Sequence, residues 1–467
     1  MRNKDQFMAS LHDGREVYYR GKRVDSIPDH SVLRIAALHA AKLFEMDRMI
    51  ADEKLGNISK YFKIPASEAD LIQRHRLIYE TTMACNGIFN ISQAIGSDAL
   101  FALKIVSAET DAKYGTTYSK AVEKYRSHVA ENDLTLAVAQ TDVKGDRKKR
   151  PHEQTDPDMY VHVSKVEKEG IIVNGAKAHT TQAAVSDEII VLPTRAMTEK
   201  DKEYTVAFAI PASTKGLKFI VRPIDELEGN SSAIISKRDY ELETLTIFEN
   251  VFVPWSRVFL FREFELAGRL AVLFATFHRF TAVSYRSATA NLYLGTAIAV
   301  AKENGISEAA HVKNRLVDLV MYKELMRMSA VAAAYLPVIA KGIAVPDPLY
   351  TNIGKLYSNE HFSRVLDALV DVSGGIISTL PSFEDQTNDM ESKLISKYLS
   401  GAGPGEKRMK VLRLAKELGA SSFTGYMLAL MLHAEGSVEA SKLALLRDAD
   451  LGEAEQVIEK ILSSDSG

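Results

Sequence analysis

Cysteine is almost absent from this chain of 467 residues, in which Cys85 is the only one. A single thiol cannot form a disulfide within the chain, and it cannot supply the several thiolates that hold an iron–sulfur cluster. A strong charge of either sign is also lacking, since 58 Lys and Arg residues face 61 Asp and Glu residues and leave a formal net charge of -3. This balance indicates neither nucleic acid nor an anionic membrane surface as a partner. We expect no metal ligands.

Long hydrophobic runs are missing as well. No apolar stretch reaches the ~20 residues that a membrane-spanning helix needs. The richest stretch, residues 328–343, is short and rich in Ala, which favours a buried bundle helix. The N-terminus has no apolar segment of the secretory type, so we expect a cytoplasmic protein. A hydrophobic content of 46% is typical of a globular chain, and the length predicts two or three domains.

The centre of the chain has the pattern of a β-sheet. Val and Ile alternate with polar residues, and Gly and Pro interrupt the segments, which is typical of antiparallel strands. The strands expected in this region cover residues 136–140, 160–166, 171–173, 187–192, 204–210, 217–221 and 244–253.

Helical patterns flank the sheet on both sides. Before it we expect a short hairpin at 18–24 and helices at 32–52, 71–89, 91–108 and 111–132; after it we expect helices at 264–304, 307–340, 348–372, 406–418 and 421–433. The chain is therefore predicted to be an α+β protein with an N-terminal α-helical domain (1–133), a central antiparallel β-domain (134–260) and a C-terminal helical bundle with a tail (261–467). This order is similar to that of the acyl-CoA dehydrogenase fold. The two-sided apolar character of the long helices favours packing against a neighbouring subunit.

Two polar loops follow strands of the sheet, at 140–147 and 174–182. Backbone N–H groups and hydroxyls at strand ends can bind a pyrophosphate and the polar edge of a flavin ring. Small polar turns of this kind are also common without any ligand. Spacing alone does not decide between these two interpretations.

Several segments carry a specific resemblance. Residues 142–151, 156–162, 175–179, 248–254, 277–279, 373–375 and 408–413 resemble the family of the oxygenase component of 4-hydroxyphenylacetate 3-hydroxylase and of 4-hydroxybutyryl-CoA dehydratase. The resemblance extends over the whole chain and is closer to the dehydratase branch. It implies an FAD-binding homotetramer, a dimer of dimers, with the acyl-CoA dehydrogenase-like fold.

The resemblance also implies which residues contact the cofactor. Thr181 would lie near the reactive N5 edge of the flavin, and Gly374 and Gly375 would approach the FAD of a neighbouring subunit. The two glycines could equally form a helix-ending turn. The remaining flavin contacts would come from Gln140, Thr141, Asp142, Lys144, Gly145, Asp146, Arg147, Thr180 and Gln182.

The chain departs from the dehydratase pattern at its iron–sulfur cluster. His278 matches the cluster's histidine, but the cysteine that follows falls on Tyr285 and the next lysine on Arg286. The paired cysteines of the N-terminal domain have no counterpart. The glutamate base that precedes a His-x-x-Gly-Ser segment is missing too, because residues 430–432 before His433 are apolar. We therefore expect neither a cluster nor dehydration of a 4-hydroxyacyl thioester.

His278, Tyr285, Arg286 and His433 are the candidate catalytic residues. Each has a structural alternative: a packed core histidine, a buried aromatic ring, a bundle salt bridge and a helix C-terminal cap, respectively. Three functions follow from the resemblance. The first is a two-component flavin monooxygenase that hydroxylates a phenol with O2 and FAD reduced by a separate reductase. The second is isomerisation or oxidation of a CoA thioester, and the third is a non-catalytic paralogue.

Overall fold

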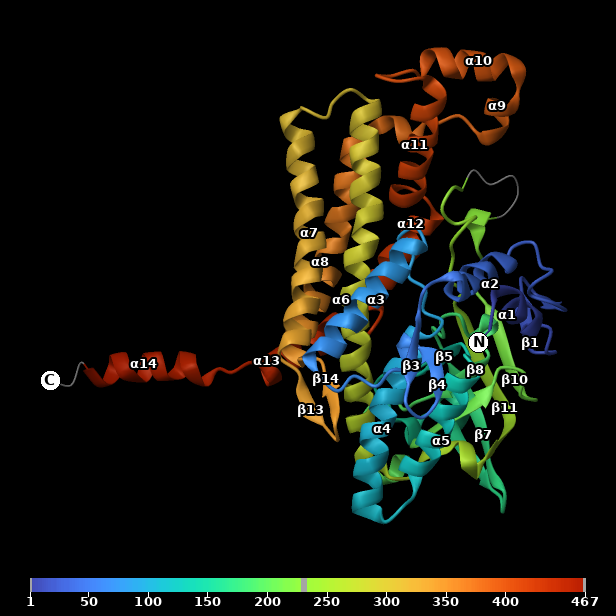
Figure 1. Ribbon diagram of the computed structural model, residues 1–467, viewed down its shortest axis with the longest axis vertical. Coiled ribbons are helices and arrows are strands. Elements are labelled where there is room, and N and C mark those ends of the chain that lie inside the picture. Colours follow the sequence, from blue (N-terminus) through green and yellow to red (C-terminus); the bar gives the residue numbers. More distant parts are fainter. Residues whose placement is uncertain (1, 228–232, 465–467) are drawn as a thin grey trace.

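The computed structural model describes residues 2–227 and 233–464. Two β-sheets lie beside an upright bundle of long helices, and helices α3 (Glu68–Ala84) and α4 (Ala94–Tyr114) lie between the sheets and the bundle (Figure 1). The last helix, α14 (Gly452–Ser464), extends away from the body as an arm. None of the described helices is long and apolar enough to span a membrane.

The central region holds two sheets. One has six strands in the order β2-β1-β10-β11-β7-β6, and the other has four in the order β12-β9-β8-β5. Most neighbouring strands are antiparallel, as predicted, but β5 pairs with β8 and β1 with β10 in parallel. The strands are β1 (Glu16–Tyr19), β2 (Lys22–Val24), β5 (Leu136–Ala139), β6 (His162–Val166), β7 (Gly170–Lys177), β8 (Glu188–Val191), β9 (Val206–Pro211), β10 (Leu217–Val221), β11 (Thr244–Pro254) and β12 (Val258–Phe261).

The predicted N-terminal hairpin exists as β1 and β2, but it joins the six-stranded sheet. The prediction of one helix over 32–52 is wrong. Helix α2 ends at Ala41, and the chain continues into the hairpin of β3 (Met49–Asp52) and β4 (Gly56–Ser59). The side chain of Arg48 explains the break, because it is buried, donates to the carbonyl of Leu43 and pairs with Asp133. The N-terminal helices are α1 (Lys4–Ser10), α2 (Arg34–Ala41), α3 (Glu68–Ala84), α4 (Ala94–Tyr114) and α5 (Tyr118–Glu131).

The C-terminal region is helical, as predicted. The expected helix over 307–340 is shorter, however: it ends at Tyr335 and is followed by a hairpin of β13 (Val338–Ala340) and β14 (Ile343–Val345). Lys341 and Gly342 both have positive φ, which is the geometry of a tight hairpin turn. The helices are α6 (Phe264–Glu303), α7 (Ala310–Tyr335), α8 (Pro348–Ser373), α9 (Phe383–Thr387), α10 (Asp389–Tyr398), α11 (Gly405–Gly419), α12 (Ser422–His433) and α13 (Val438–Asp448), followed by α14.

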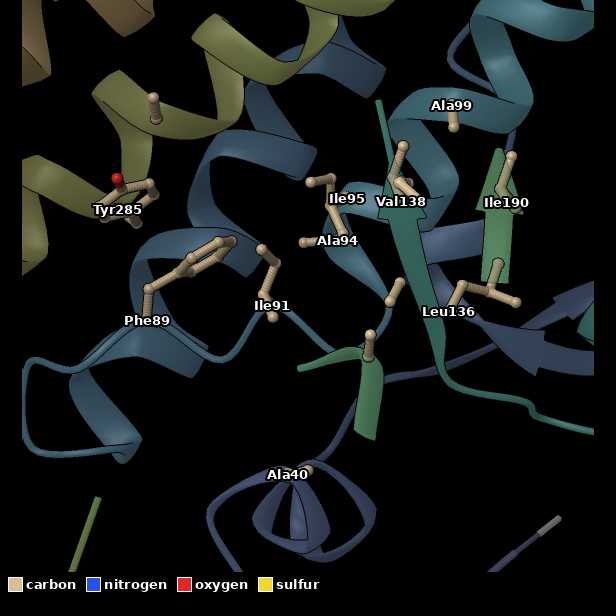
Figure 2. Close-up of a cluster of buried hydrophobic side chains, with 14 of the residues drawn as sticks. Ala40, Phe89, Ile91, Ala94, Ile95, Ala99, Leu136, Val138, Ile190 and Tyr285 are labelled. Atoms are coloured by element: carbon tan, nitrogen blue, oxygen red, sulfur yellow. The ribbon is translucent and has the colours of Figure 1, made fainter. Parts of the chain in front are cut away.

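One hydrophobic core joins the helices and the sheets. Figure 2 shows Ile95 of α4 beside Val138 of β5, and Tyr285 of α6 facing Phe89 of the loop after α3. Because this core is continuous, it holds the central sheets against the bundle. The predicted boundaries at 133/134 and 260/261 stay a prediction, and residues 465–467 of the expected last domain lie outside the described part of the chain.

Candidate functional site

The two loops expected to bind the flavin lie side by side. The N–H of Ala178 donates to the carbonyl of Thr141 at 2.8 Å, and Asp142 forms an isolated bridge with Lys177. The Lys177 ammonium is 2.5 Å from the Asp142 carboxylate and also donates to the carbonyl of Gln140 at 2.8 Å. Both charged side chains are 3% exposed. Asp142 therefore forms a buried ion pair that connects the two loops.

The outer part of the first loop is a tight turn at the surface. Lys144 and Gly145 both have positive φ, at 72° and 48°. Gln154 holds the turn by accepting from the N–H of Asp146 at 3.0 Å and donating to its carbonyl at 2.9 Å. Arg147 next to it is exposed. A tight loop with an exposed guanidinium suits the phosphates of a dinucleotide.

The second loop is hydrogen-bonded to the start of β11 and to the segment just before it. The N–H of Thr180 donates to the carbonyl of Thr244 at 3.1 Å. The side-chain hydroxyl of Thr180 is buried and has no hydrogen-bond partner. Gln182 makes two bonds with the backbone of Leu242, at 2.7 and 3.1 Å, and is 1% exposed. Gln182 therefore shapes the loop from inside. The unpartnered hydroxyl of Thr180 is the kind of buried group that a ligand could satisfy.

The hydroxyl of Thr181 contacts the carboxylate of Glu243, which was not predicted from the sequence. Its hydroxyl donates to Glu243 at 2.9 and 3.1 Å, and the hydroxyl of Tyr426 donates to the same carboxylate at 3.1 Å. Burial raises the pKa of Glu243 from 4.5 to about 7, against the opposing effect of these hydroxyls and of Arg222. A carboxyl group able to hold or release a proton near neutral pH therefore lies beside the residue expected at the flavin N5 edge.

Tyr285 and Arg286 lie together with a second carboxylate that was not predicted, Glu435. The Tyr285 hydroxyl donates to Glu435 Oε1 at 3.1 Å, and Arg286 donates to Oε2 at 2.6 Å and to Ser358 at 3.0 Å. Burial raises the pKa of Tyr285 far above its ordinary value; burial opposes the charge of Arg286, but Glu435 raises the pKa of this guanidinium overall. Arg286 is charged and Tyr285 protonated. The ring of Tyr285 stacks on Phe89 at 4.3 Å between centroids and 12° between planes.

His278 lies on the same helix in a different environment. Its ring stacks on Phe274, and its Nδ1 is 3.5 Å from Oδ2 of Asp98. Both of these atoms are buried without a hydrogen-bond partner within bonding distance and angle. Asp98 in turn accepts from Arg74 at 2.6 Å. His278 thus lies beside the buried carboxylate of Asp98 rather than in the Tyr285 group.

His433 and the two glycines lie at helix ends. His433 is the exposed last residue of α12. Burial lowers the pKa of His179 in the second loop, and Lys144 and then His433 contribute smaller effects in the same direction. The end of α12 therefore lies near the expected flavin loop. Gly374, with φ 71°, ends α8 by donating to the carbonyls of Val370 and Asp371, and both it and Gly375 are exposed. Their approach to a neighbouring FAD stays a prediction.

A buried group of His39, Cys85 and Asp239 also escaped the sequence reasoning. Each offers a possible metal-ligating atom, and these atoms lie within 4.8 Å of one another. His39 Nδ1 lies 2.8 Å from Asp239 and Nε2 lies 2.9 Å from the carbonyl of Phe89, and because both neighbours are acceptors, His39 carries two protons. Burial lowers the pKa of His39, but Asp239 raises it overall to about 10. A protonated His39 positions the Phe89 loop and is not available as a metal ligand.

Two family models together match almost the whole chain. The family model for the N-terminal part of 4-hydroxyphenylacetate 3-hydroxylase matches residues 3–260, and the model for its C-terminal part matches residues 267–463. The chain belongs to the 4-hydroxyphenylacetate 3-hydroxylase family. The predicted resemblance is thereby confirmed.

Two curated relatives in this family have different activities. The 4-hydroxybutyryl-CoA dehydratase/vinylacetyl-CoA-Delta-isomerase of Clostridium aminobutyricum is 30% identical, over 98% of this chain and 98% of the relative. The 4-hydroxyphenylacetate 3-monooxygenase oxygenase component of Thermus thermophilus is 26% identical, over 87% of this chain and 86% of the relative. The family thus includes both branches that the sequence resembles.

Solved structures confirm the acyl-CoA dehydrogenase-like fold. A 4-hydroxybutyryl-CoA dehydratase from N. maritimus superposes with a TM-score of 0.94 at 26% identity, covering 99% of this chain and 95% of the other. The oxygenase component of 4-hydroxyphenylacetate 3-monooxygenase, complexed with FAD and 4-hydroxyphenylacetate, superposes with a TM-score of 0.92 at 23% identity, covering 100% and 99%. The second likeness establishes the fold alone.

Proposed function

We propose that this member of the family binds FAD and acts as the oxygenase of a two-component flavin monooxygenase on a phenolic substrate. The observation that carries the proposal is the stack of Tyr285 on Phe89. Tyr285 stands where the dehydratase pattern has a cluster cysteine, and the stack fills that position with aromatic rings. With one cysteine in the chain, we infer that no iron–sulfur cluster is present. Oxygenase chemistry needs none.

The chain's own residues would bind the flavin through the two joined loops. The turn of Lys144 and Gly145 with exposed Arg147 suits the pyrophosphate, and Thr180 and Thr181 offer hydroxyls to the ring. FAD, once reduced, would supply the activation of O2. Glu243, bonded to Thr181, would hold or release a proton beside the ring, because its pKa of about 7 allows both forms.

Assembly and partners extend this proposal. α7 presents a row of exposed apolar side chains along one face, which is typical of a surface covered in an oligomer, and a homotetramer would cover it. A flavin reductase would be a transient partner, and the cytoplasm the compartment. The most exposed apolar residues of the row are Val317 at 58%, Met321 at 51%, Met328 at 60% and Tyr335 at 63%.

The test is a single reaction with matched variants. The purified protein is mixed anaerobically with reduced FAD and 4-hydroxyphenylacetate, O2 is added, and the catechol product is quantified. We expect product with wild type and with Thr181→Ser, which keeps the hydroxyl, and much less with Thr181→Val. Catalase in every reaction removes free peroxide. FAD binding without any product from a panel of phenols would contradict the oxygenase assignment.

A CoA thioester is the second candidate substrate class. The observation that favours it is the 30% identity to the dehydratase/isomerase across almost the entire chain. Under this alternative the protein would purify with oxidised FAD and would isomerise vinylacetyl-CoA without O2 or a reductase. A chain that binds neither FAD form would instead be the non-catalytic paralogue.

A further inference from the structure

Positive charge is in excess where helices α6 and α8 meet the turn between α12 and α13. Three cations lie there, Arg279, Arg286 and Lys355, and we call them the cation cluster. Arg286 and Lys355 are fully buried and Arg279 is half-buried. Burying a cation is unfavourable unless an anion or several acceptors compensate its charge. The cation cluster therefore raises the question of which anion it is built for.

The acceptors around Arg279 and Lys355 are neutral. Arg279 donates to the backbone carbonyl of Glu435 at 3.0 Å and to the amide oxygen of Asn352 at 2.6 Å. Lys355 donates to the carbonyl of Gly436 and to the hydroxyl of Ser441. Burial lowers the pKa of Lys355 to about 7 and that of Arg279 below its ordinary value, although the Glu435 carboxylate acts in the opposite direction on both.

Within the described residues, the one carboxylate hydrogen-bonded to the cation cluster is that of Glu435. Its side chain is 2% exposed, with one oxygen accepting from Arg286 at 2.6 Å and the other from the Tyr285 hydroxyl at 3.1 Å. This carboxylate enters from an exposed turn and not from a helix: Glu435 has φ 57°, a left-handed conformation uncommon for this residue type, and Gly436 follows with φ 101°. A surface turn thus places a carboxylate into a buried set of donors.

We propose that Glu435 occupies a binding site for the carboxylate of a small organic acid, and that Arg286 is the residue that selects this group. When the acid binds, its two oxygens take the positions of the Glu435 oxygens on Arg286 and Tyr285, and the turn releases Glu435 to solvent. The donor set determines the ligand class, since a guanidinium N–H and a phenol O–H already hold a planar carboxylate. Calling the acid a substrate rests on the proposed function, but its binding does not.

A purely structural salt bridge between α6 and the turn is the alternative, and the two differ in ligand preference. The test measures dissociation constants by calorimetry, without FAD or O2, for 4-hydroxyphenylacetate and its neutral amide, 4-hydroxyphenylacetamide. Acetate and acetamide are measured alongside them, so that a ring too large for the site does not hide the preference. The variants are Glu435→Gln, Arg286→Gln and, as a control on the same helix, Arg269→Gln at an exposed pair with Glu109.

We expect the preference for acid over amide to rise about tenfold or more in Glu435→Gln, because the competing carboxylate is removed. It should vanish in Arg286→Gln and stay at the wild-type value in Arg269→Gln. Glu435→Asp keeps the charge but is one methylene shorter, so the preference for acid over amide should rise by an intermediate amount. This variant replaces Glu435→Gln in the test if Glu435→Gln does not fold. An acid preference that is the same in wild type and in the Glu435 variants, for both probe pairs, would overturn the proposal.

The outcome separates this inference from the proposed oxygenase activity. Selective binding of the acid in Glu435→Gln, with no hydroxylation by wild type, would uphold the carboxylate site and refute the oxygenase. If wild type hydroxylates a phenol but the acid preference does not depend on Glu435, the oxygenase is upheld and the carboxylate site is refuted.

Discussion

Glu243 makes the stability of this protein depend on pH in a direction opposite to that of most carboxylates. Its pKa is raised from 4.5 to about 7, with burial as the main cause. The folded state therefore holds the proton more tightly than the unfolded chain does. The resulting loss in the free energy of unfolding is absent below pH 4.5. It grows as the pH rises from 4.5 to about 7 and is complete above about pH 7.

The magnitude follows from the size of the shift. One pKa unit corresponds to about 1.4 kcal/mol, so the ionised carboxylate costs the folded state about 3 kcal/mol in full and about 2–3 kcal/mol between pH 5 and pH 8. Glu243→Gln removes the titration and keeps an oxygen that accepts from Thr181 and Tyr426. The variant should match wild type near pH 5 and exceed its stability by this amount at pH 8.

Urea unfolding at pH 5 and pH 8, followed by far-UV circular dichroism at one protein concentration, measures the difference. The control is Glu249→Gln on β11, the strand that follows Glu243; this exposed carboxylate is paired with Lys218, and its effect should stay within about 0.5 kcal/mol at both pH values. If the difference in unfolding free energy between wild type and Glu243→Gln is the same at pH 5 and pH 8, the electrostatic reasoning for Glu243 is refuted.

Three further substitutions test the site. Lys177→Met leaves Asp142 buried without its partner, so urea unfolding should show a loss of about 3–5 kcal/mol and fluorescence titration should show weaker FAD binding; unchanged FAD affinity would separate these loops from the cofactor. Arg48→Met unpairs Asp133 in the same way and should lower stability by a similar amount without weakening FAD binding, which makes it the matched control. Tyr285→Phe keeps the stacked ring but loses the bond to a charged carboxylate, so we expect a loss of about 1.5–3 kcal/mol in urea unfolding; no loss would mean that the hydroxyl bond does not contribute.

The order of helices and strands could be predicted because it depends on local periodicity. The strand expected at 136–140 forms as β5, and the one at 187–192 forms as β8. The errors arose where a long-range contact or a turn overrides the pattern. The buried pair of Arg48 and Asp133 ends a helix early, and no local signal announces it. The hairpin turn at Lys341 and Gly342 has positive φ, and the glycine there could have predicted the end of the helix.

The site could be predicted only in part. Sequence reasoning reached Thr181, Tyr285 and Arg286 through motifs, and the structure places each of them against a carboxylate. It did not reach those carboxylates, Glu243 and Glu435, because they enter from an irregular segment and a turn that are distant in sequence. A buried carboxyl becomes chemically distinct through the partners that surround it, and these are known only once the chain has folded.

The surroundings of Tyr285 indicate how a site in this fold could alter its chemistry without altering its architecture. Tyr285 belongs to the same continuous core as the strands that carry the loops proposed to bind the flavin, so a residue there must fill its volume whatever its chemical role. A tyrosine does so by stacking on Phe89, and its hydroxyl reaches Glu435. The carbonyl of Phe89 is fixed independently by His39, which Asp239 orients. The loops proposed to bind the flavin are joined by a separate ion pair, Asp142 with Lys177. Since the loops proposed to bind the flavin and the Tyr285 group have separate supports, side chains in the bundle could be exchanged while these loops keep their shape.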